Sequence, residues 1–198
     1  MLTIPFLSSI QNFNIYLFYL INNSLSNNFL NTILPYFTEL GSFLFLLTLC
    51  VIIFIIGGKK GKKVAIMGLL GIGLTSLLVL IIKPLVGEPR PFLSLAHVNL
   101  LVVETGVYSF PSGHTSLIFT LATILGLNYE FKIFKRKILF IYPALIIAGI
   151  VGFSRIYVGV HYPFDIIGGM ILGIISGLTV IKLCKYIFKI KKIEKILS

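Results

Sequence analysis

The chain has 198 residues, of which 57% are hydrophobic, with a net charge of +11 and a mean hydropathy of +1.03. Ordinary soluble domains are roughly 45–50% apolar, so this composition excludes a soluble globular domain and predicts a membrane protein with several spans. The charge does not indicate nucleic-acid binding, because all but three of the 17 basic residues lie in clusters that flank apolar runs.

The N-terminal region, residues 1–32, is apolar but interrupted. Polar residues break up residues 1–23, and the cleaner part, residues 15–21, is shorter than the ~20 residues that cross a bilayer. This pattern predicts an interfacial or short re-entrant helix, with an irregular sixth span as the alternative. Residues 22–32 are rich in Asn and Ser, which predicts a loop with helix-capping chemistry.

The remaining apolar runs predict an all-α membrane bundle with five firm transmembrane helices, at residues 33–56, 64–82, 112–128, 138–153 and 164–188. Together they form one membrane-embedded domain over residues 33–190, followed by a basic tail at 191–198. Cys50 and Cys184 fall inside apolar runs, so we expect small buried side chains rather than a disulfide or a metal pair.

The basic clusters predict the orientation of the bundle. They lie in the expected loops 57–63 and 129–137 and in the C-terminal tail, and lysine-rich segments stay on the cytoplasmic side. With five spans, the segments 83–111 and 154–163 must then both face the outside of the plasma membrane. The same external side receives the three basic residues outside the clusters and two of the histidines: Lys83, Arg90, Arg155, His114 and His161.

The segment 154–165 joins two apolar runs and concentrates charge where hydrocarbon ends. Pro163 suits the first turn of a helix, and Asp165 would lie in that turn at the positive end of the helix dipole. His161 precedes Asp165 by four residues, within reach of its carboxylate. A histidine held by an aspartate beside Arg155 suits nucleophilic attack on an anionic substrate, although a capped helix start with an incidental histidine is the alternative.

Two further motifs predict anion binding on the same side. Lys83 and Arg90 form a cation pair suited to phosphate, although a lysine at a span end can simply reach for the interface. Ser112 is a natural N-cap, and Gly113 would let a phosphate approach the free N–H groups of the helix. His114 would face the same place; the alternative is a capped helix with a polar first turn.

The three motifs together resemble the signature of the type 2 phosphatidic acid phosphatase family, whose superfamily includes the vanadium haloperoxidases. The matching pieces are Lys83-x6-Arg90-Pro91, Pro111-Ser112-Gly113-His114 and Ser154-Arg155-x5-His161-x3-Asp165. Each piece alone is weakly or moderately specific, whereas the triple is highly specific and spans roughly residues 64–185. In length and span number the chain is similar to the short undecaprenyl-diphosphate phosphatases of bacteria.

This resemblance implies a cofactor-free, metal-independent phosphatase. His161 would attack phosphorus and form a phosphohistidine, and Asp165 would hold its imidazole in the right tautomer. His114 would serve as general acid and then general base. The transferring group would be held by Lys83, Arg90, Arg155, Ser112 and Gly113. His97 matches no part of the signature and is expected to be an ordinary loop histidine.

The expected function is therefore hydrolysis of a lipid phosphate at the external face, with a polyprenyl diphosphate as the leading substrate. Phosphatidic acid and phosphatidylglycerol phosphate are alternatives within the same chemistry. A vanadate-dependent haloperoxidase and a non-catalytic lipid carrier are the alternatives outside it. Membrane lipids and the lipid phosphate are the expected partners, nucleic acid is not, and the oligomeric state stays open.

Overall fold

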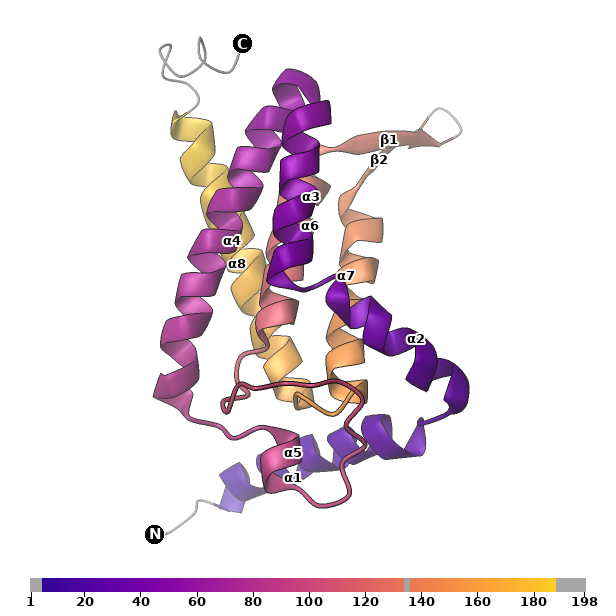
Figure 1. The fold of residues 1–198 in the computed structure, drawn as a ribbon. Helices are drawn as coiled ribbons and strands as arrows, with labels where there is room; N and C mark the ends of the chain where they lie inside the picture. The colour runs from indigo at the N-terminus through magenta and orange to yellow at the C-terminus, as the bar shows by residue number, and fades with distance from the viewer. Residues whose placement is uncertain (1–4, 134–135, 188–198) are drawn as a thin grey trace.

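The computed structural model describes residues 5–133 and 136–187, and this part of the chain forms a helical bundle with one short hairpin (Figure 1). The helices are α1 (Pro5–Tyr19), the π-helix η1 (Leu20–Ser24), α2 (Asn28–Glu39), α3 (Phe43–Ile56), α4 (Gly58–Val86), α5 (Pro91–Ser94), α6 (Gly113–Asn128), α7 (Ile141–Tyr157) and α8 (Pro163–Ile187); the strands are β1 (Glu130–Ile133) and β2 (Arg136–Leu139). The predicted helical class is confirmed. The predicted basic tail lies outside the described residues.

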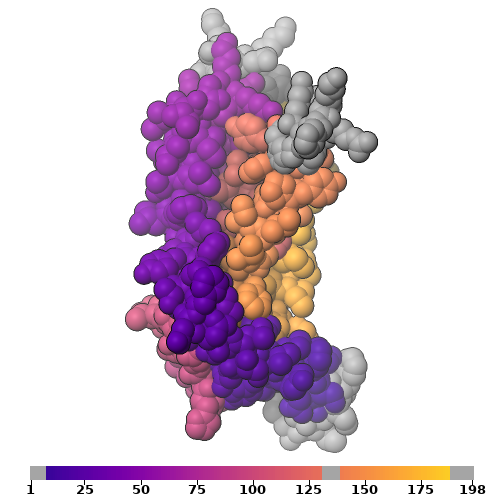
Figure 2. Space-filling model, turned by 90° about the vertical axis from the view of Figure 1, so that its right-hand side faces the viewer, coloured from indigo at the N-terminus to yellow at the C-terminus, as the bar shows by residue number. Residues whose placement is uncertain are grey.

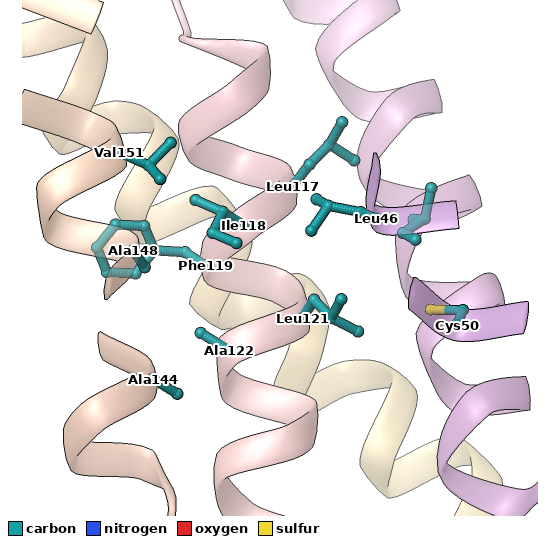
Figure 3. Close-up of a cluster of buried hydrophobic side chains, with 11 residues drawn as sticks. Leu46, Cys50, Leu117, Ile118, Phe119, Leu121, Ala122, Ala144, Ala148 and Val151 are labelled. Carbon is teal, nitrogen blue, oxygen red and sulfur yellow. The ribbon is translucent and has the colours of Figure 1, made fainter. Parts of the chain in front are cut away.

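Helix α6 is the centre of the bundle and packs against α4, α7 and α8. From Thr115 to Ile124 every residue of α6 is buried, because its neighbours cover it on all sides. Figure 3 shows the main apolar cluster, in which side chains of α6 lie between those of α3 and α7. A helix enclosed in this way needs no contact with lipid, so its threonines and serines can hydrogen-bond inside the protein.

Glycines let α8 approach α6 closely. A β-carbon at Gly169 would come within 2.9 Å of the Ser112 carbonyl oxygen, and one at Gly177 within 3.0 Å of the Thr120 carbonyl oxygen. Gly173, between them, faces the same backbone. This spacing of four residues is typical of close helix packing in membranes. It brings the N-terminal ends of α6 and α8 together at one end of the bundle.

The predicted count of five full spans is not confirmed. Among the described residues, two helices, α4 and α8, are long and apolar enough to cross a membrane, and α2 with α3 would make a third if counted as one bent span. Helices α6 and α7 have 16 and 17 residues, which at ~1.5 Å per residue is shorter than the ~30 Å hydrocarbon core.

The predicted first span at 33–56 is broken. Helices α2 and α3 meet at an angle of 56°, with the break at residues 40–42. Gly41 lies at the break, where a β-carbon would come within 2.7 Å of Val151 and 3.1 Å of the Cβ of His114. The break therefore lets the chain pass close to the start of α6.

Several predicted loop boundaries are wrong. The segment 57–63 is not a loop: α4 starts at Gly58, so its lysines lie in the first turns of a helix. The segment 129–137 contains strands of an antiparallel hairpin, in which Glu130 pairs with Leu139. Helix α7 runs to Tyr157, beyond the predicted end at residue 153, so Arg155 lies in a helix rather than in an external loop.

The N-terminal region lies across the lower end of the bundle in Figure 1, and in Figure 2 it lies over the lower part of the face in view, beside the segment that follows α4. The expected loop at 22–32 is mostly helical, since η1 continues to Ser24 and α2 starts at Asn28. Buried asparagines attach this region to the rest of the chain: Asn14 accepts a hydrogen bond from the Phe164 N–H, 3.1 Å, and Asn22 donates to the Tyr157 carbonyl, 2.7 Å. The region thus braces the segment that precedes α8.

Candidate active site

Four helix ends converge at the lower end of the bundle and bring the three sequence motifs together (Figure 1). These are the last turns of α4 and α7 and the first turns of α6 and α8. Lys83 lies in the last turn of α4 and Arg155 in the last turn of α7. His114 lies in the first turn of α6 and Asp165 in the first turn of α8. Arg90 and His161 lie in the loops that follow α4 and α7. Residues that are far apart in the sequence thus meet because their helices pack side by side.

His161 is held on both sides of its ring. Its Nδ1 lies 3.1 Å from Asp165 Oδ2, and its Nε2 lies 3.3 Å from Nη1 of Arg90. A guanidinium can only donate, so Nε2 must be the accepting nitrogen and Nδ1 carries the proton. The backbone N–H of Tyr162 also donates to Asp165 Oδ2, at 2.7 Å. The predicted pairing of His161 with Asp165 is thus present in the structure, with the Nε2 lone pair free of a proton.

The environment keeps His161 neutral. The side chain is 1% exposed, and burial lowers its pKa well below the ordinary value of 6.5. The positive charges of Arg90, Arg155 and Lys83 lower this pKa further, because a second positive charge beside them is unfavourable. An imidazole that stays unprotonated at neutral pH keeps the lone pair that a nucleophile needs.

The three cations are anchored by other parts of the chain. Lys83 Nζ donates to the carbonyl oxygens of Tyr108 and Ser109, at 2.7 and 3.1 Å. Arg90 Nη1 donates to the Val160 carbonyl, 3.1 Å, and Arg155 Nη1 donates to Thr38 Oγ1, 2.8 Å. Among the described residues, the buried Nε atoms of both arginines have no hydrogen-bond partner. Since a buried donor without a partner is costly, these N–H groups suit an anionic ligand.

Ser112 caps α6 as the sequence predicts. Its Oγ accepts from the Thr115 N–H at 3.4 Å, and its own N–H donates to the Asp165 carbonyl at 3.1 Å. That backbone bond ties the start of α6 directly to the first turn of α8. Gly113 and His114 follow as the first residues of α6. His97, in contrast, is exposed in the loop after α5 and lies outside this set, as expected.

Sequence reasoning missed Glu104. Its carboxylate lies between the two arginines, with Oε1 3.4 Å from Arg90 Nη2 and Oε2 2.9 Å from Arg155 Nη2. It belongs to the long loop between α5 and α6 and is 22% exposed. A lone acid in a loop carries no local signal, and only the folded chain shows that it neutralises two arginines.

Sequence reasoning also missed Ser109. This side chain is fully buried, and its hydroxyl donates a hydrogen bond to Asp165 Oδ2. The same Oγ lies 3.2 Å from His161 Nδ1. The only available signal was its position just ahead of the Pro111-Ser112-Gly113-His114 motif, which does not specify a contact with α8.

An apolar cavity of about 220 Å³ adjoins the polar site. It lies between α3, α4 and α6, and its lining includes Phe43, Val79, Lys83, Gly113 and Leu117. One wall therefore carries the Lys83 cation and the start of α6, whereas the rest is apolar apart from Ser76. This arrangement suits a molecule with an anionic head and an apolar chain.

The buried histidine, its carboxylate and the surrounding cations, placed at one end of an apolar helix bundle, define a membrane phosphatase. The chain belongs to the PAP2 superfamily, whose sequence pattern matches residues 65–189.

Curated relatives extend this assignment. Undecaprenyl-diphosphatase BcrC of Bacillus subtilis is 34% identical over 76% of this chain and 73% of its own length. An undecaprenyl-diphosphatase of Sulfolobus acidocaldarius is 32% identical over 94% of this chain and 85% of its own. Among solved structures, the transmembrane PAP2 type phosphatidylglycerolphosphate phosphatase of Bacillus subtilis is similar, with a TM-score of 0.71 and 27% identity over 90% of this chain and 88% of its own.

Proposed function

We propose that this phosphatase hydrolyses a polyprenyl diphosphate, of the undecaprenyl type, to the monophosphate and inorganic phosphate. Two relatives that cover most of this chain are named undecaprenyl-diphosphatases. The apolar cavity beside Lys83 supports a lipid substrate, because a chain attached to the phosphate can lie there while the head reaches the cations.

In the first step, Nε2 of His161 attacks the terminal phosphorus. The P–N bond forms while the bond between phosphorus and the bridging oxygen breaks, and His114 donates a proton to the departing lipid monophosphate. Asp165 accepts from Nδ1–H throughout and stabilises the positive charge that develops on the ring. The product of this step is a phosphohistidine at His161.

In the second step, water attacks the phosphorus of the phosphohistidine. His114, now lacking its proton, takes one from the water as the P–N bond breaks, so inorganic phosphate leaves and both histidines return to their starting states. Lys83, Arg90 and Arg155 stabilise the charge on the phosphoryl oxygens in both steps, with Ser112 and the Gly113 N–H completing the cradle.

The observation that carries this proposal is the pair of buried guanidinium Nε–H groups that have no partner in the part of the chain that the structure describes, beside a histidine whose Nε2 is unprotonated. Planar guanidinium groups bind phosphate through parallel N–H donors. We further propose that this end of the bundle faces the outside of the plasma membrane and that the C-terminus is cytoplasmic, since the lysines that start α4 and those near the end of α8 lie at the other end.

The decisive experiment measures phosphate release by the purified protein on a panel of lipid phosphates. Undecaprenyl diphosphate should be turned over with the highest kcat/KM, and activity should survive EDTA. Phosphatidylglycerol phosphate belongs in the panel, because a solved structure similar to this one is a phosphatase for that lipid. Preference for it would replace the proposed substrate, and a strict requirement for Mg²⁺ would overturn the mechanism.

A further inference from the structure

Ser109 connects the elements that carry the site. Its backbone N–H donates to the Glu88 carbonyl at 2.7 Å, and its carbonyl accepts from Lys83 Nζ at 3.1 Å. Its hydroxyl points the other way, to Asp165 and His161. The residue is therefore fixed to the end of α4 through its backbone, while its side chain contacts the first turn of α8 and the loop before it.

The direction of each hydrogen bond follows from the chemistry of the partners. Oδ2 of Asp165 accepts from the Tyr162 N–H, and the Ser109 hydroxyl donates to the same oxygen. The lone pairs of Oγ are then free to face the Nδ1–H of His161, 3.2 Å away. That N–H thus lies between two acceptors, because Asp165 Oδ2 is 3.1 Å from it.

Asp165 needs this support. The terminal torsion of a carboxylate is broad, so a single hydrogen bond does not determine its orientation. The Tyr162 N–H and the Ser109 hydroxyl both donate to Oδ2. Two donors from different segments therefore hold the same oxygen against His161.

We propose that Ser109 is a positioning residue for the nucleophile, which orients the Asp165 carboxylate and holds His161 in its Nδ1–H form with Nε2 aimed at the phosphate. This role rests on the proposed phosphohistidine mechanism. Ser109 does not touch the reacting atoms, since its hydroxyl is used by Asp165 and faces the opposite ring nitrogen. It therefore acts on the rate of attack and leaves phosphate binding to the cations.

The kinetic experiment compares Ser109→Ala with wild type on the preferred lipid phosphate. In the Ser-His-Asp triad of serine proteases, loss of tautomer control lowers kcat by about 10⁴-fold. Because Asp165 and the Tyr162 N–H remain in Ser109→Ala, we expect kcat to fall by only about 10- to 100-fold. KM and the inhibition constant for vanadate should stay within about twofold, because the cradle is intact. Ser109→Thr, which restores a hydroxyl, should recover most of kcat.

Ser116→Ala is the matched control. Ser116 is also fully buried near the start of α6, but its hydroxyl donates to the Ser112 carbonyl of its own helix, 2.8 Å. This variant should keep kcat within about twofold of wild type. Equal losses in Ser109→Ala and Ser116→Ala would indicate a packing effect and overturn the inference, as would an unchanged kcat in Ser109→Ala.

A second readout does not depend on turnover. The chain has three histidines, so ¹⁵N spectra of histidine-labelled protein can be assigned with single His variants. In wild type, His161 should show a protonated Nδ1 and a bare Nε2, and Ser109→Ala should shift population toward the other tautomer. An unchanged tautomer in Ser109→Ala would refute the inference even where the Thr variant does not fold. Wild type that releases no phosphate from any lipid would instead refute the proposed function.

Discussion

At the scale of single residues, His161 and Asp165 have separable tasks. His161 supplies the attacking nitrogen, whereas Asp165 determines the protonation and orientation of the ring. Both side chains lie at the end of the bundle, away from the main apolar cluster of α3, α6 and α7. Their substitution should therefore change chemistry more than it changes folding.

His161→Ala should abolish turnover while the purified protein keeps its elution profile and thermal midpoint in detergent. Asp165→Asn should leave weak activity, with a loss of up to about 10⁴-fold, because tautomer control is impaired while the nucleophile remains. Phosphate release and acid-quench trapping of a labelled phosphoenzyme measure both effects. Near-normal release by folded His161→Ala would remove the nucleophile assignment.

Glu104 occupies the space between Arg90 and Arg155, where an anionic substrate would bind. The neutral variant Glu104→Gln removes a competing negative charge, so inorganic phosphate and vanadate should inhibit more strongly, by about three- to tenfold. The measurement is the inhibition constant of each anion at one ionic strength.

Glu39→Gln is the matched control for Glu104. Glu39 is an exposed acid at the end of α2, next to the Thr38 that binds Arg155. Its neutralisation should change both inhibition constants by less than about twofold, because Glu39 acts on Arg155 only through a weak charge interaction. Weaker anion inhibition in Glu104→Gln would show instead that the carboxylate holds the arginines in a binding-competent arrangement.

At the scale of helices, the close contact between α6 and α8 determines where the motifs meet. Ser112 starts α6 and Asp165 lies in the first turn of α8, and the hydrogen bond between their backbones depends on that contact. The glycines at positions 169, 173 and 177 make the contact possible. A substitution in the middle of α8 that separates the two helices should therefore displace Ser112 and Asp165 and lower activity.

Gly173→Ala should destabilise the protein and lower activity together. Its β-carbon would fall against the Ser116 carbonyl and within 2.8 Å of Phe119 Cβ, so the helices must separate, at a cost of about 1–3 kcal/mol. Gly149→Ala in α7 is the control, since nothing lies within 4 Å of the added atom. Thermal unfolding in detergent and phosphate release test the pair; a Gly173→Ala protein as stable and active as the control would refute the tight contact.

At the scale of the whole molecule, the bundle separates its charges. The lysines at positions 59, 60, 62 and 63 start α4, and those at 182 and 185 end α8, so they lie at the upper end in Figure 1. The candidate site lies at the lower end. The orientation predicted from the sequence, with the lysines facing the cytoplasm and the site facing outward, stays a prediction.

Thiol labelling of intact cells tests this orientation. After replacement of the buried Cys50 and Cys184, a cysteine should be introduced by Val103→Cys, a position that is 96% exposed near the site. It should react with a membrane-impermeant reagent, whereas Lys59→Cys, exposed at the opposite end, should react only after the membrane is opened. The reverse pattern would invert the protein and place phosphate release in the cytoplasm.

The sequence by itself determined the helical class, most of the helix positions and the group of residues that share one end of the bundle. These features depend on neighbours along the chain: apolar runs long enough to bury, Ser112 as a cap, Pro163 as a helix start, and lysines beside span ends. Such local signals can be recognised in the sequence before the packing of the helices is known. The pairing of His161 with Asp165 was also predictable, because four residues separate them across a helix start.

Only the tertiary structure decided the break between α2 and α3, the helical course of the segments at 22–32 and 57–63, and the contacts of Glu104 and Ser109. Glu104 and Ser109 lie on a loop whose path depends on the ends of α4, α7 and α8. Their partners are 14 to 56 positions away along the chain. Neither hydrophobic periodicity nor a helix cap predicts a contact between residues so far apart in the sequence. The packing of α4, α7 and α8 brings these partners together, and it exists only in the folded chain.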